Sequence, residues 1–145
     1  VHTTPTILAD GTVVFGADDG MVYAVHAGRL RWKVQTGSAV KSSVTVTPQG
    51  TLIVGSDDQH LYAISPAGAV LWKQRLGAAI RGSAAVSLEG NLFVGTEDGT
   101  LYGLGPDGRI VSAHKTGGAL TSSPAIGPDG MVVVGSQDGK VWGFW

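Results

Sequence analysis

The feature that most constrains this chain is an internal repeat with a period of about 40 residues. Glycines recur in one column at nearly equal intervals, at Gly16, Gly55, Gly95 and Gly135. Three positions after each glycine stands an aspartate, giving a second column of Asp19, Asp58, Asp98 and Asp138. A period in this range is typical of architectures in which each unit buries its apolar surface against its neighbours. The sequence therefore predicts four copies of one structural unit.

Each repeat also carries one aromatic column and three turn signals. The aromatic column, inside short apolar runs, holds Tyr23, Tyr62, Tyr102 and Trp142. Glycine readily adopts a positive φ, so two further glycine columns predict hairpin turns, one beginning at Gly11 and one at Gly28. The aspartate column predicts the third turn, because an aspartate side chain can bond its own turn backbone. Three turns per repeat imply four strands.

The segments between the turns are short, and none shows a sustained helical period. Several are apolar at consecutive positions, as in Val132-Val133-Val134, which suits a sheet covered on both faces. The segment before the first turn of each repeat has the smallest side chains, as in Ser42-Ser43-Val44-Thr45, which suits strands that converge on an axis. The sequence predicts an all-β fold, a β-propeller built of four-stranded blades.

The predicted blades span residues 1–38, 39–78, 79–118 and 119–145, within a single propeller domain or a propeller fragment. The fourth is truncated, because the chain stops at Trp145, where its outer strand would begin. Propellers close with about four to eight blades, so we expect a tight four-bladed ring, a ring completed by another chain, or a fragment. Completion by another chain is favoured, since three and a fraction blades leave apolar faces exposed. The first residue, Val1, also suggests a processed chain or an excised piece of a longer one.

Tryptophan recurs on the predicted outermost strands of the first two blades. Trp32 and Trp72 lie one repeat apart, whereas the third repeat has Ser112 in this column. Full burial of a large aromatic side chain contributes about 1.5 to 3 kcal/mol. We therefore expect both tryptophans to stabilise contacts between blades, and one such contact to be missing in the third repeat.

Composition and charge exclude several classes of protein. Apolar residues make up 43% of the chain and charged residues 14%, which is too hydrophobic for a disordered segment. The net charge is −1 and the basic residues are dispersed, so we expect no nucleic-acid partner. No apolar run approaches the ~20 residues that span a bilayer, and no signal-peptide pattern is present, so we expect a soluble chain without membrane insertion. The lack of cysteine excludes disulfides and a cysteine nucleophile.

The repeat resembles the PQQ-like β-propeller repeat, named after pyrroloquinoline quinone. The shared pattern is Gly-Ser/Thr-x-Asp-Gly-x-Leu-Tyr-Ala-Ile, then a glycine turn, Leu-x-Trp-Lys and a closing glycine. Its best representative runs from Leu52 to Gly77, and the resemblance covers essentially the whole chain. Departures are Ser112 and the shorter turn at His26-Ala27-Gly28. The resemblance implies the propeller fold and favours a bacterial periplasmic or extracellular setting.

The family includes quinoprotein dehydrogenases, which carry pyrroloquinoline quinone and calcium. It also includes non-enzymatic scaffolds such as the β-barrel-assembly lipoprotein of the bacterial outer membrane. The dehydrogenases commonly hold the quinone beside two adjacent cysteines, which this chain lacks. The resemblance therefore favours the scaffold branch, with no cofactor.

The sequence contains no recognisable catalytic or metal site. Acidic pairs such as Asp18-Asp19 recur once per blade without the dense spacing of a calcium loop, so we interpret them as turns. One column is more suggestive, because Lys41 and Arg81 directly precede the innermost strands, where the other repeats have His2 and Thr121. A positive ring at the mouth of the axial channel would hold an anion or an acidic loop of a partner. The alternative is a set of solvated charges that keep the mouth wet.

We therefore expect a non-catalytic scaffold or protein-interaction module, whose partner is another protein or a second copy that completes the ring. Two alternatives stay open. One is a fragment of a quinoprotein-like enzyme whose site needs further blades. The other is an excised or engineered propeller fragment without activity of its own. Cofactor absorbance, or activity in a complete ring, would favour the enzyme.

Overall fold

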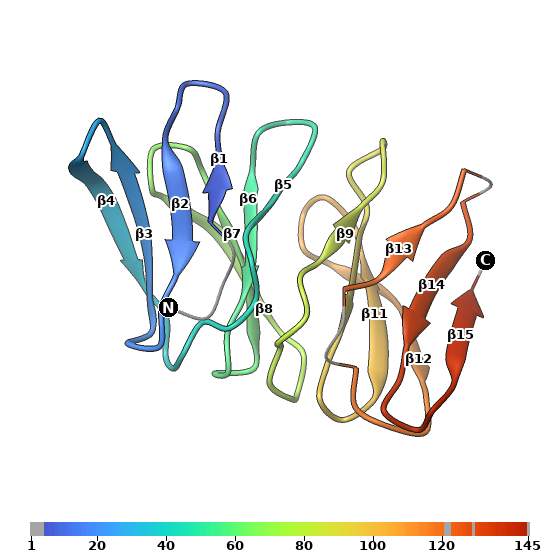
Figure 1. Cartoon of the computed structure of the whole chain (residues 1–145). Coiled ribbons are helices and arrows are strands. Elements are labelled where there is room, and N and C mark those ends of the chain that lie inside the picture. Colours follow the sequence, from blue (N-terminus) through green and yellow to red (C-terminus); the bar gives the residue numbers. More distant parts are fainter. Residues whose placement is uncertain (1–4, 121–122, 129, 145) are drawn as a thin grey trace.

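The chain folds into four antiparallel β-sheets, which stand side by side in an array (Figure 1). The computed structural model describes residues 5–120, 123–128 and 130–144. These residues form fifteen strands and no helix. The prediction of three complete blades and a truncated fourth is confirmed, because three sheets have four strands and the last has three.

The strands follow one another in sequence order within each sheet. Sheet 1 contains β1 (Thr6–Ile7), β2 (Val13–Gly16), β3 (Met21–His26) and β4 (Arg29–Gln35). Sheet 2 contains β5 (Thr45–Val46), β6 (Leu52–Gly55), β7 (His60–Ile64) and β8 (Val70–Arg75). Sheet 3 contains β9 (Ala85–Val86), β10 (Leu92–Gly95), β11 (Thr100–Leu104) and β12 (Ile110–Lys115). Sheet 4 contains β13 (Ala125–Ile126), β14 (Val132–Gly135) and β15 (Val141–Phe144).

The array is open at both ends. The short inner strands β5, β9 and β13 lie next to one another along one edge of the array. Sheets 1 and 4 stand at opposite ends, so the four sheets do not close into a tight ring (Figure 1). The arrangement is that of a propeller segment.

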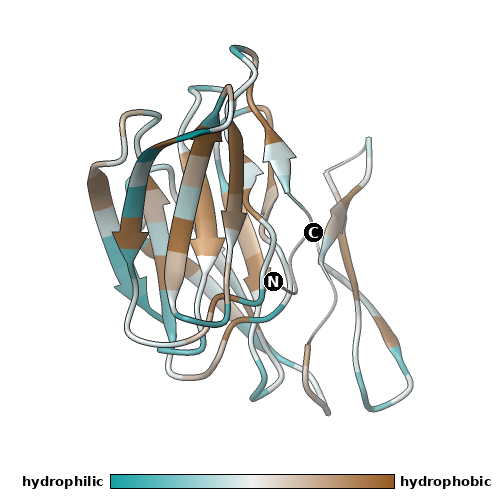
Figure 2. Ribbon diagram, turned by 60° about the vertical axis from the view of Figure 1, so that its left-hand side comes forward, coloured by the Kyte–Doolittle hydropathy of each residue, from teal (hydrophilic) through white to brown (hydrophobic). Residues whose placement is uncertain are grey.

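The apolar core lies between successive sheets. Between sheets 1 and 2, Val14 and Val22 of sheet 1 pack with Leu52, Val54 and Ile64 of sheet 2. All five side chains are at most 1% exposed. The same columns form a second core between sheets 2 and 3 and a third between sheets 3 and 4. Hydrophobic residues accordingly concentrate on the strands and hydrophilic residues on the loops (Figure 2). Each sheet depends on its neighbours for burial, as in other repeat proteins.

The glycine column marks the place where the connector to the next sheet crosses the end of a strand. A Cβ on Gly55, at the end of β6, would lie 2.2 Å from Cγ2 of Ile80. A Cβ on Gly16 would lie 2.2 Å from Cγ1 of Val40. Carbon atoms do not approach so closely without strain. The period of the glycine column therefore reflects one repeated close contact.

Trp32 and Trp72 link neighbouring sheets from the outer strands. Nε1 of Trp32 donates to the carbonyl of Pro66 at 2.9 Å, in the turn between β7 and β8. Nε1 of Trp72 donates to the carbonyl of Pro106 in the next sheet at 3.3 Å. In sheet 3 the column holds Ser112, which lines a cavity of about 90 Å³. The expected contacts are present in the first two sheets, and Ser112 supplies no indole in the third.

One turn departs from the others because it lacks a glycine. Gln59 has a φ of 75°, at a position where Gly20, Gly99 and Gly139 have φ values of 84–87°. A Cβ on Gly99 would lie 2.7 Å from the carbonyl oxygen of Gly118, in the connector that follows sheet 3. The corresponding connector beside Gln59 is rearranged, since its Gly77 has a φ of 86°. The connector beside Gln59 therefore differs in conformation from the one beside Gly99.

We expect Gln59→Gly to raise the free energy of unfolding by about 1 kcal/mol, because the left-handed conformation costs a residue with a Cβ about that much. The exposed hydrogen bond from Arg75 to Oε1 of Gln59 is lost, but such a contact contributes little. Urea denaturation measures the change. The control is Gly99→Ala, which adds a Cβ at the equivalent position of sheet 3 and should destabilise the chain. A stabilising Gly99→Ala, or a destabilising Gln59→Gly, would contradict this explanation.

Candidate functional site

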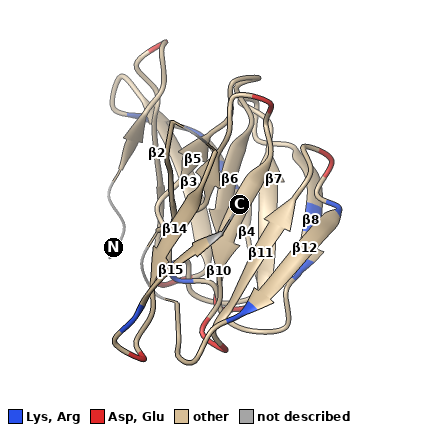
Figure 3. Cartoon of the chain, turned by 90° about the vertical axis from the view of Figure 1, so that its right-hand side faces the viewer, with Lys and Arg blue, Asp and Glu red and all other residues tan. Residues whose placement is uncertain are grey.

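Two rims with different loops border the array. One rim carries the turns between the second and third strands and the connectors between sheets. The other carries the remaining hairpin turns. Charged residues gather on the loops and on the outer strands β8 and β12 (Figure 3). The connector rim is the one that holds the predicted Lys41–Arg81 column.

Backbone hydrogen bonds fix each connector to the neighbouring turn. The N–H of Asp57 donates to the carbonyl of Ala39 at 2.9 Å, and that of Glu97 donates to Ala79 at 3.0 Å. The N–H of Val40 in turn donates to the carbonyl of Ala17 at 3.0 Å. The connector after sheet 1 is thereby held between the turns of sheets 1 and 2. This brings the charged side chains of turn and connector together.

Four of these side chains form a charged cluster of alternating sign, Lys41, Asp57, Arg81 and Glu97, which we call the rim cluster. Nζ of Lys41 lies 4.0 Å from Oδ2 of Asp57, and Nε of Arg81 lies 3.4 Å from Oδ1 of the same carboxylate. Nη1 of Arg81 lies 2.8 Å from Oε1 of Glu97. The cluster therefore spans sheets 2 and 3 and contains as many acids as bases. His2 and Thr121 of the predicted column lie outside the described residues.

Within the rim cluster the cations are more exposed than the carboxylates. The side chains of Lys41 and Arg81 are 37% and 40% exposed, against 17% for Asp57 and 34% for Glu97. Asp57 is the least exposed of the four side chains, and its carboxylate lies against both cations. Exposed ion pairs of this kind contribute little to stability. The arrangement of these ion pairs matters more for which charged groups of a partner can approach the rim than for stability.

The aspartate column organises the turns on the same rim. Oδ1 of each aspartate accepts the backbone N–H two positions later, at 2.9 to 3.1 Å. The donors belong to the first residues of β3, β7 and β11 and to the residue before β15, namely Met21, His60, Thr100 and Lys140. This is the turn geometry expected of aspartate. The second carboxylate oxygen is left for contacts beyond the turn.

The aromatic column supplies one of those contacts. The hydroxyls of Tyr23 and Tyr62 donate to the carboxylates of Asp19 and Asp58. Oδ2 of Asp58 also accepts the N–H of Gly37 from the connector after sheet 1, at 2.8 Å. Asp138 binds the N–H of Gly117 in the same way, at 3.1 Å. The aspartates thus join neighbouring sheets as well as closing turns.

Sheet 3 has a different version of this contact. The hydroxyl of Tyr102 donates to the carbonyl of Leu76 at 2.6 Å. Asp98 is bonded instead by the hydroxyl of Thr96, within its own turn. The difference accompanies the positive φ of Gly77, the residue that follows this carbonyl. Trp142 replaces the tyrosine in sheet 4 and packs against the core cluster of Leu101, Leu120, Val132 and Val134.

The pKa of Asp58 is lowered from its ordinary value. Burial by itself would raise this pKa, but hydrogen bonds from Tyr62 and from the N–H groups of Gly37 and His60 outweigh that effect. The pKa of Tyr62 is raised, first by burial and then by its hydrogen bond to the Asp58 carboxylate. Both shifts favour the pair in which Asp58 is ionised and Tyr62 is neutral.

We expect Asp58→Asn to lower the free energy of unfolding at pH 7 by about 1 to 2 kcal/mol, because a nearly buried acceptor of three donors loses its charge. A carboxyl whose folded-state pKa is depressed stabilises the fold above an ordinary carboxyl pKa of about 4, and this stabilisation is lost as the pH falls below it. The difference between the two proteins should therefore shrink below about pH 4. Urea titrations across this range measure it. A difference independent of pH would contradict the assigned role.

A row of hydroxyl groups, which sequence reasoning missed, joins the inner edges of the sheets. Oγ of Ser83 accepts the N–H of Ser43 at 2.9 Å, and Oγ of Ser123 accepts the N–H of Ser83 at 3.0 Å. Oγ1 of Thr6 and Thr45 donates to carbonyls of the next sheet at 2.8 Å. Crowding near an axis therefore explains only part of the preference for small residues in this segment. Their recurrence as serine and threonine was the signal of hydrogen bonding.

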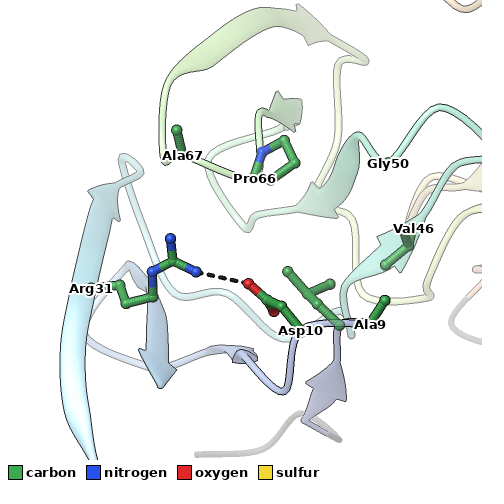
Figure 4. Close-up of a pocket in the computed structure, with 8 residues that line it drawn as sticks. Ala9, Asp10, Arg31, Val46, Gly50, Pro66 and Ala67 are labelled. Atoms are coloured by element: carbon green, nitrogen blue, oxygen red, sulfur yellow. Dashed lines mark hydrogen bonds and ion pairs between the residues drawn. The ribbon is translucent and has the colours of Figure 1, made fainter. Parts of the chain in front are cut away.

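A pocket lies on the opposite rim, between sheets 1 and 2 (Figure 4). It has a volume of about 450 Å³ and is lined mainly by small apolar groups, including Val46, Pro66 and Ala67. Nη1 of Arg31 lies 3.0 Å from Oδ2 of Asp10 at its side. The only sequence signal for it was Arg31, which stands where the other repeats have Leu71 and Val111.

Histidine and acidic side chains do not gather into a metal site in the described part of the chain. In residues 5–120, 123–128 and 130–144, no group of three such side chains is placed to hold a metal ion. The same ranges contain no helix long and apolar enough to cross a membrane.

Solved structures provide the first comparison. The chain is 23% identical to BamB from Moraxella catarrhalis, with a TM-score of 0.83 over 98% of this chain and 44% of that one. It is 20% identical to the computationally designed Ika8 protein, with a TM-score of 0.85 over 99% of this chain and 45% of that one. A protein of unknown function from Bacteroides caccae matches at 15% identity, with a TM-score of 0.71 over 99% of this chain and 60% of that one. At these identities the likeness shows the fold, and the chain spans less than half of BamB and Ika8.

The sequence itself provides the second comparison. No curated protein matches it. A family model described as outer membrane protein assembly factor BamB matches residues 2–67 and 57–144, which together cover nearly the whole chain. The predicted relationship to PQQ-like repeats and to the assembly scaffold is confirmed. This chain belongs to the BamB-like family of PQQ-type β-propeller repeats.

Proposed function

We propose that this chain is a non-catalytic protein-interaction module that binds an acidic segment of a partner protein at the rim cluster. The observation that carries the proposal is the position of Lys41 and Arg81, both more than a third exposed, beside the less exposed carboxylate of Asp57. Arginine held at a fixed angle can bind a second carboxylate with two parallel hydrogen bonds. An acidic side chain of a partner would therefore meet cations that are already positioned.

The hydrogen bonds made by the other acidic side chains of this rim support the proposal of a scaffold. The aspartates of the repeat column are committed to turn and connector hydrogen bonds. These bonds maintain a rigid rim on which loops are displayed. The family relationship agrees, since the matching model is described as an assembly factor. Rigid repeat scaffolds of this type offer extended surfaces for protein partners.

The test is the binding of a fluorescent decapeptide rich in aspartate and glutamate, measured by anisotropy at low and high salt. We expect the double substitution Lys41→Ala, Arg81→Ala to weaken binding by about tenfold or more, since two positioned cations are lost. We also expect the affinity of the unaltered protein to fall with added salt.

The matched control is the double substitution Arg29→Ala, Lys73→Ala. It removes one arginine and one lysine from exposed positions on the outer strands and leaves the net charge the same as in the test variant. Equal weakening by both variants would mean that binding depends on overall charge alone. Undiminished binding by the Lys41→Ala, Arg81→Ala variant would refute the proposal.

A further inference from the structure

The pocket on the rim opposite the rim cluster is bordered by sheets 1 and 2 alone (Figure 4). Sheet 1 contributes the turn between β1 and β2 and the side chain of Arg31 on β4, and sheet 2 contributes Val46 and the turns that hold Gly50 and Pro66. These two sheets share one apolar core, so contacts within the structure fix both walls of the pocket. Its volume of about 450 Å³ lies within the range of about 300 to 1,000 Å³ that is typical of ligand sites.

A β-bulge aims Arg31 into this pocket. The register between β3 and β4 shifts between Trp32 and Leu30, so Arg31 has no partner on β3. A bulge of this kind turns a side chain out of the regular alternation of its strand. Arg31 therefore lies on the side of sheet 2, as Trp32 does. The corresponding bulge residues of sheets 2 and 3 are apolar, Leu71 and Val111.

Only one of the two amino groups of Arg31 is occupied. Nη1 donates to Oδ2 of Asp10 at 3.0 Å and to Oγ1 of Thr12 at 2.9 Å. Nη2 points away from Asp10, toward the turn that holds Ala67, and makes no hydrogen bond with the residues that the structure describes (Figure 4). Ala67 offers no acceptor side chain, whereas the equivalent turn of sheet 3 has Asp107. A charged donor is thus available at the pocket.

The equivalent place between sheets 2 and 3 is largely filled. It has a volume of only about 170 Å³. Gln49, in the position of Asp10, lies over Gly90, where a Cβ would lie 3.3 Å from its Oε1. Between sheets 1 and 2, a Cβ on Gly50 would meet no described atom within 4 Å, because Arg31 and its own turn hold the carboxylate of Asp10 to one side. The ion pair that occupies Nη1 therefore also keeps the pocket open.

We infer that this pocket binds the C-terminal residue of a partner polypeptide, where that residue is apolar, and pairs its α-carboxylate with Nη2 of Arg31. Capture of a terminal carboxylate is a recurrent mode of peptide recognition. Arginine suits this role, because a charge-assisted hydrogen bond is about twice as strong as a neutral one. The apolar side chain would lie against Leu8 and Val46, which line the pocket. The site is on the opposite rim from the rim cluster and is independent of the function proposed above.

The shallowness of the pocket favours a polypeptide end over a free acyl chain. Every residue that lines it is at least partly exposed, so a long aliphatic chain would stay largely in water. In the last residue of a polypeptide the side chain and the carboxylate stand on one Cα, so a shallow pocket can hold both. The rest of the polypeptide adds contacts on the rim, which offset the cost of association.

A nuclear magnetic resonance titration of the ¹⁵N-labelled chain tests this inference. The probe is the N-acetylated peptide Gly-Ser-Gly-Ser-Leu with a free C-terminus, compared with the same peptide amidated. We expect the free acid to bind about tenfold more tightly and to shift the amide signals of Ala9, Gly50 and Ala67. The peptide has a single charge, so the Lys41→Ala, Arg81→Ala variant should bind it as the unaltered chain does.

Two variants that copy the next repeat test the role of Arg31. Arg31→Leu introduces the residue found at Leu71, and Ala67→Asp introduces the one found at Asp107. Both positions are exposed, so the fold should tolerate either change. Each should abolish the preference for the free acid, the first by removing the cation and the second by placing a carboxylate against it. The control is Arg109→Leu, which makes the same change of charge on this rim outside the pocket and should keep the preference.

Four results would overturn the inference. They are equal binding of the free acid and the amide, a preference retained by Arg31→Leu, a preference lost in Arg109→Leu, and shifts that avoid the pocket. Octanoate, titrated in parallel, distinguishes the occupant. Tighter binding of octanoate than of the peptide would assign the pocket to free acyl chains and would overturn the polypeptide end as its ligand.

Discussion

Gly55→Ala is expected to lower the free energy of unfolding by about 2 to 3 kcal/mol, the cost of overfilling a packed site. The added methyl group would lie 2.2 Å from Cγ2 and 2.7 Å from Cβ of Ile80, a side chain that is fully buried. It would also lie 3.4 Å from Oγ of Ser42, which bonds both the N–H and the carbonyl of Gly55. Neither neighbour is at the free end of a flexible side chain. Urea denaturation followed by tryptophan fluorescence measures the loss.

Gly143→Ala provides a matched control within the same kind of strand. The added methyl group would meet Sδ of Met131 at 3.3 Å, and a methionine side chain can move. Two other repeats already have alanine in this column, at Ala24 and Ala63. We expect a change within about 0.5 kcal/mol. A loss as large as that of Gly55→Ala would show that the strands tolerate no added volume and that Gly55 is not special.

Trp32→Ala is expected to lower the free energy of unfolding by about 3 kcal/mol, since it removes a large aromatic side chain from the contact between sheets 1 and 2. The indole ring covers Gly68, where a Cβ would lie 2.6 Å from Cγ of Trp32. Its Nε1 also holds the carbonyl of Pro66. The loss should appear in urea denaturation and as faster hydrogen exchange in β1 to β4.

Trp32→Phe separates the two contributions of this side chain. It keeps most of the apolar contact and removes the hydrogen bond to Pro66, so we expect about 1 kcal/mol of the loss to remain. Leu71→Ala, at an exposed position of the adjacent outer strand β8, should have little effect. An effect of Trp32→Ala no greater than that of Leu71→Ala would contradict the role of Trp32 in joining the sheets.

The sequence predicts the fold well because its columns correspond to contacts that every blade repeats. The glycine column predicted the period of the repeat, and the structure adds the crossing connector packed against each of these glycines. The tryptophan column predicted contacts between blades, and its gap at Ser112 coincides with a small cavity. A contact that recurs in each blade requires the same type of residue at a regular interval, and this interval is visible in the sequence alone.

Features that depend on differences between repeats could not be predicted in this way. Gln59 stands where the equivalent turns have glycine, and the connector that follows its sheet differs from the others by a positive φ at Gly77. The hydroxyl of Tyr102 donates to the carbonyl of Leu76 in this connector. Each difference depends on the position of atoms in a neighbouring blade. The residue type at one position of the repeat does not predict such positions.

The candidate site was predicted only in part. Lys41 and Arg81 share a column of the repeat, and the structure places both against one carboxylate. The acids of the rim cluster were interpreted as turn residues, so their part in orienting the cations was missed. Asp57 follows Lys41 at the same spacing at which Glu97 follows Arg81, and both acids lie on the facing turns. The recurrence of opposite charges at that spacing was the available signal.

Hydrogen exchange in the presence of the acidic decapeptide tests the central claim, that the chain binds protein partners through its connector rim, most directly. The account predicts slower exchange in the connectors at residues 36–41 and 76–81 and in the turns at 56–59 and 96–99. Exchange in the opposite rim, at residues 8–11, 47–50 and 66–69, should be unchanged. Protection confined to the opposite rim, or no protection at a saturating concentration of peptide, would contradict the claim.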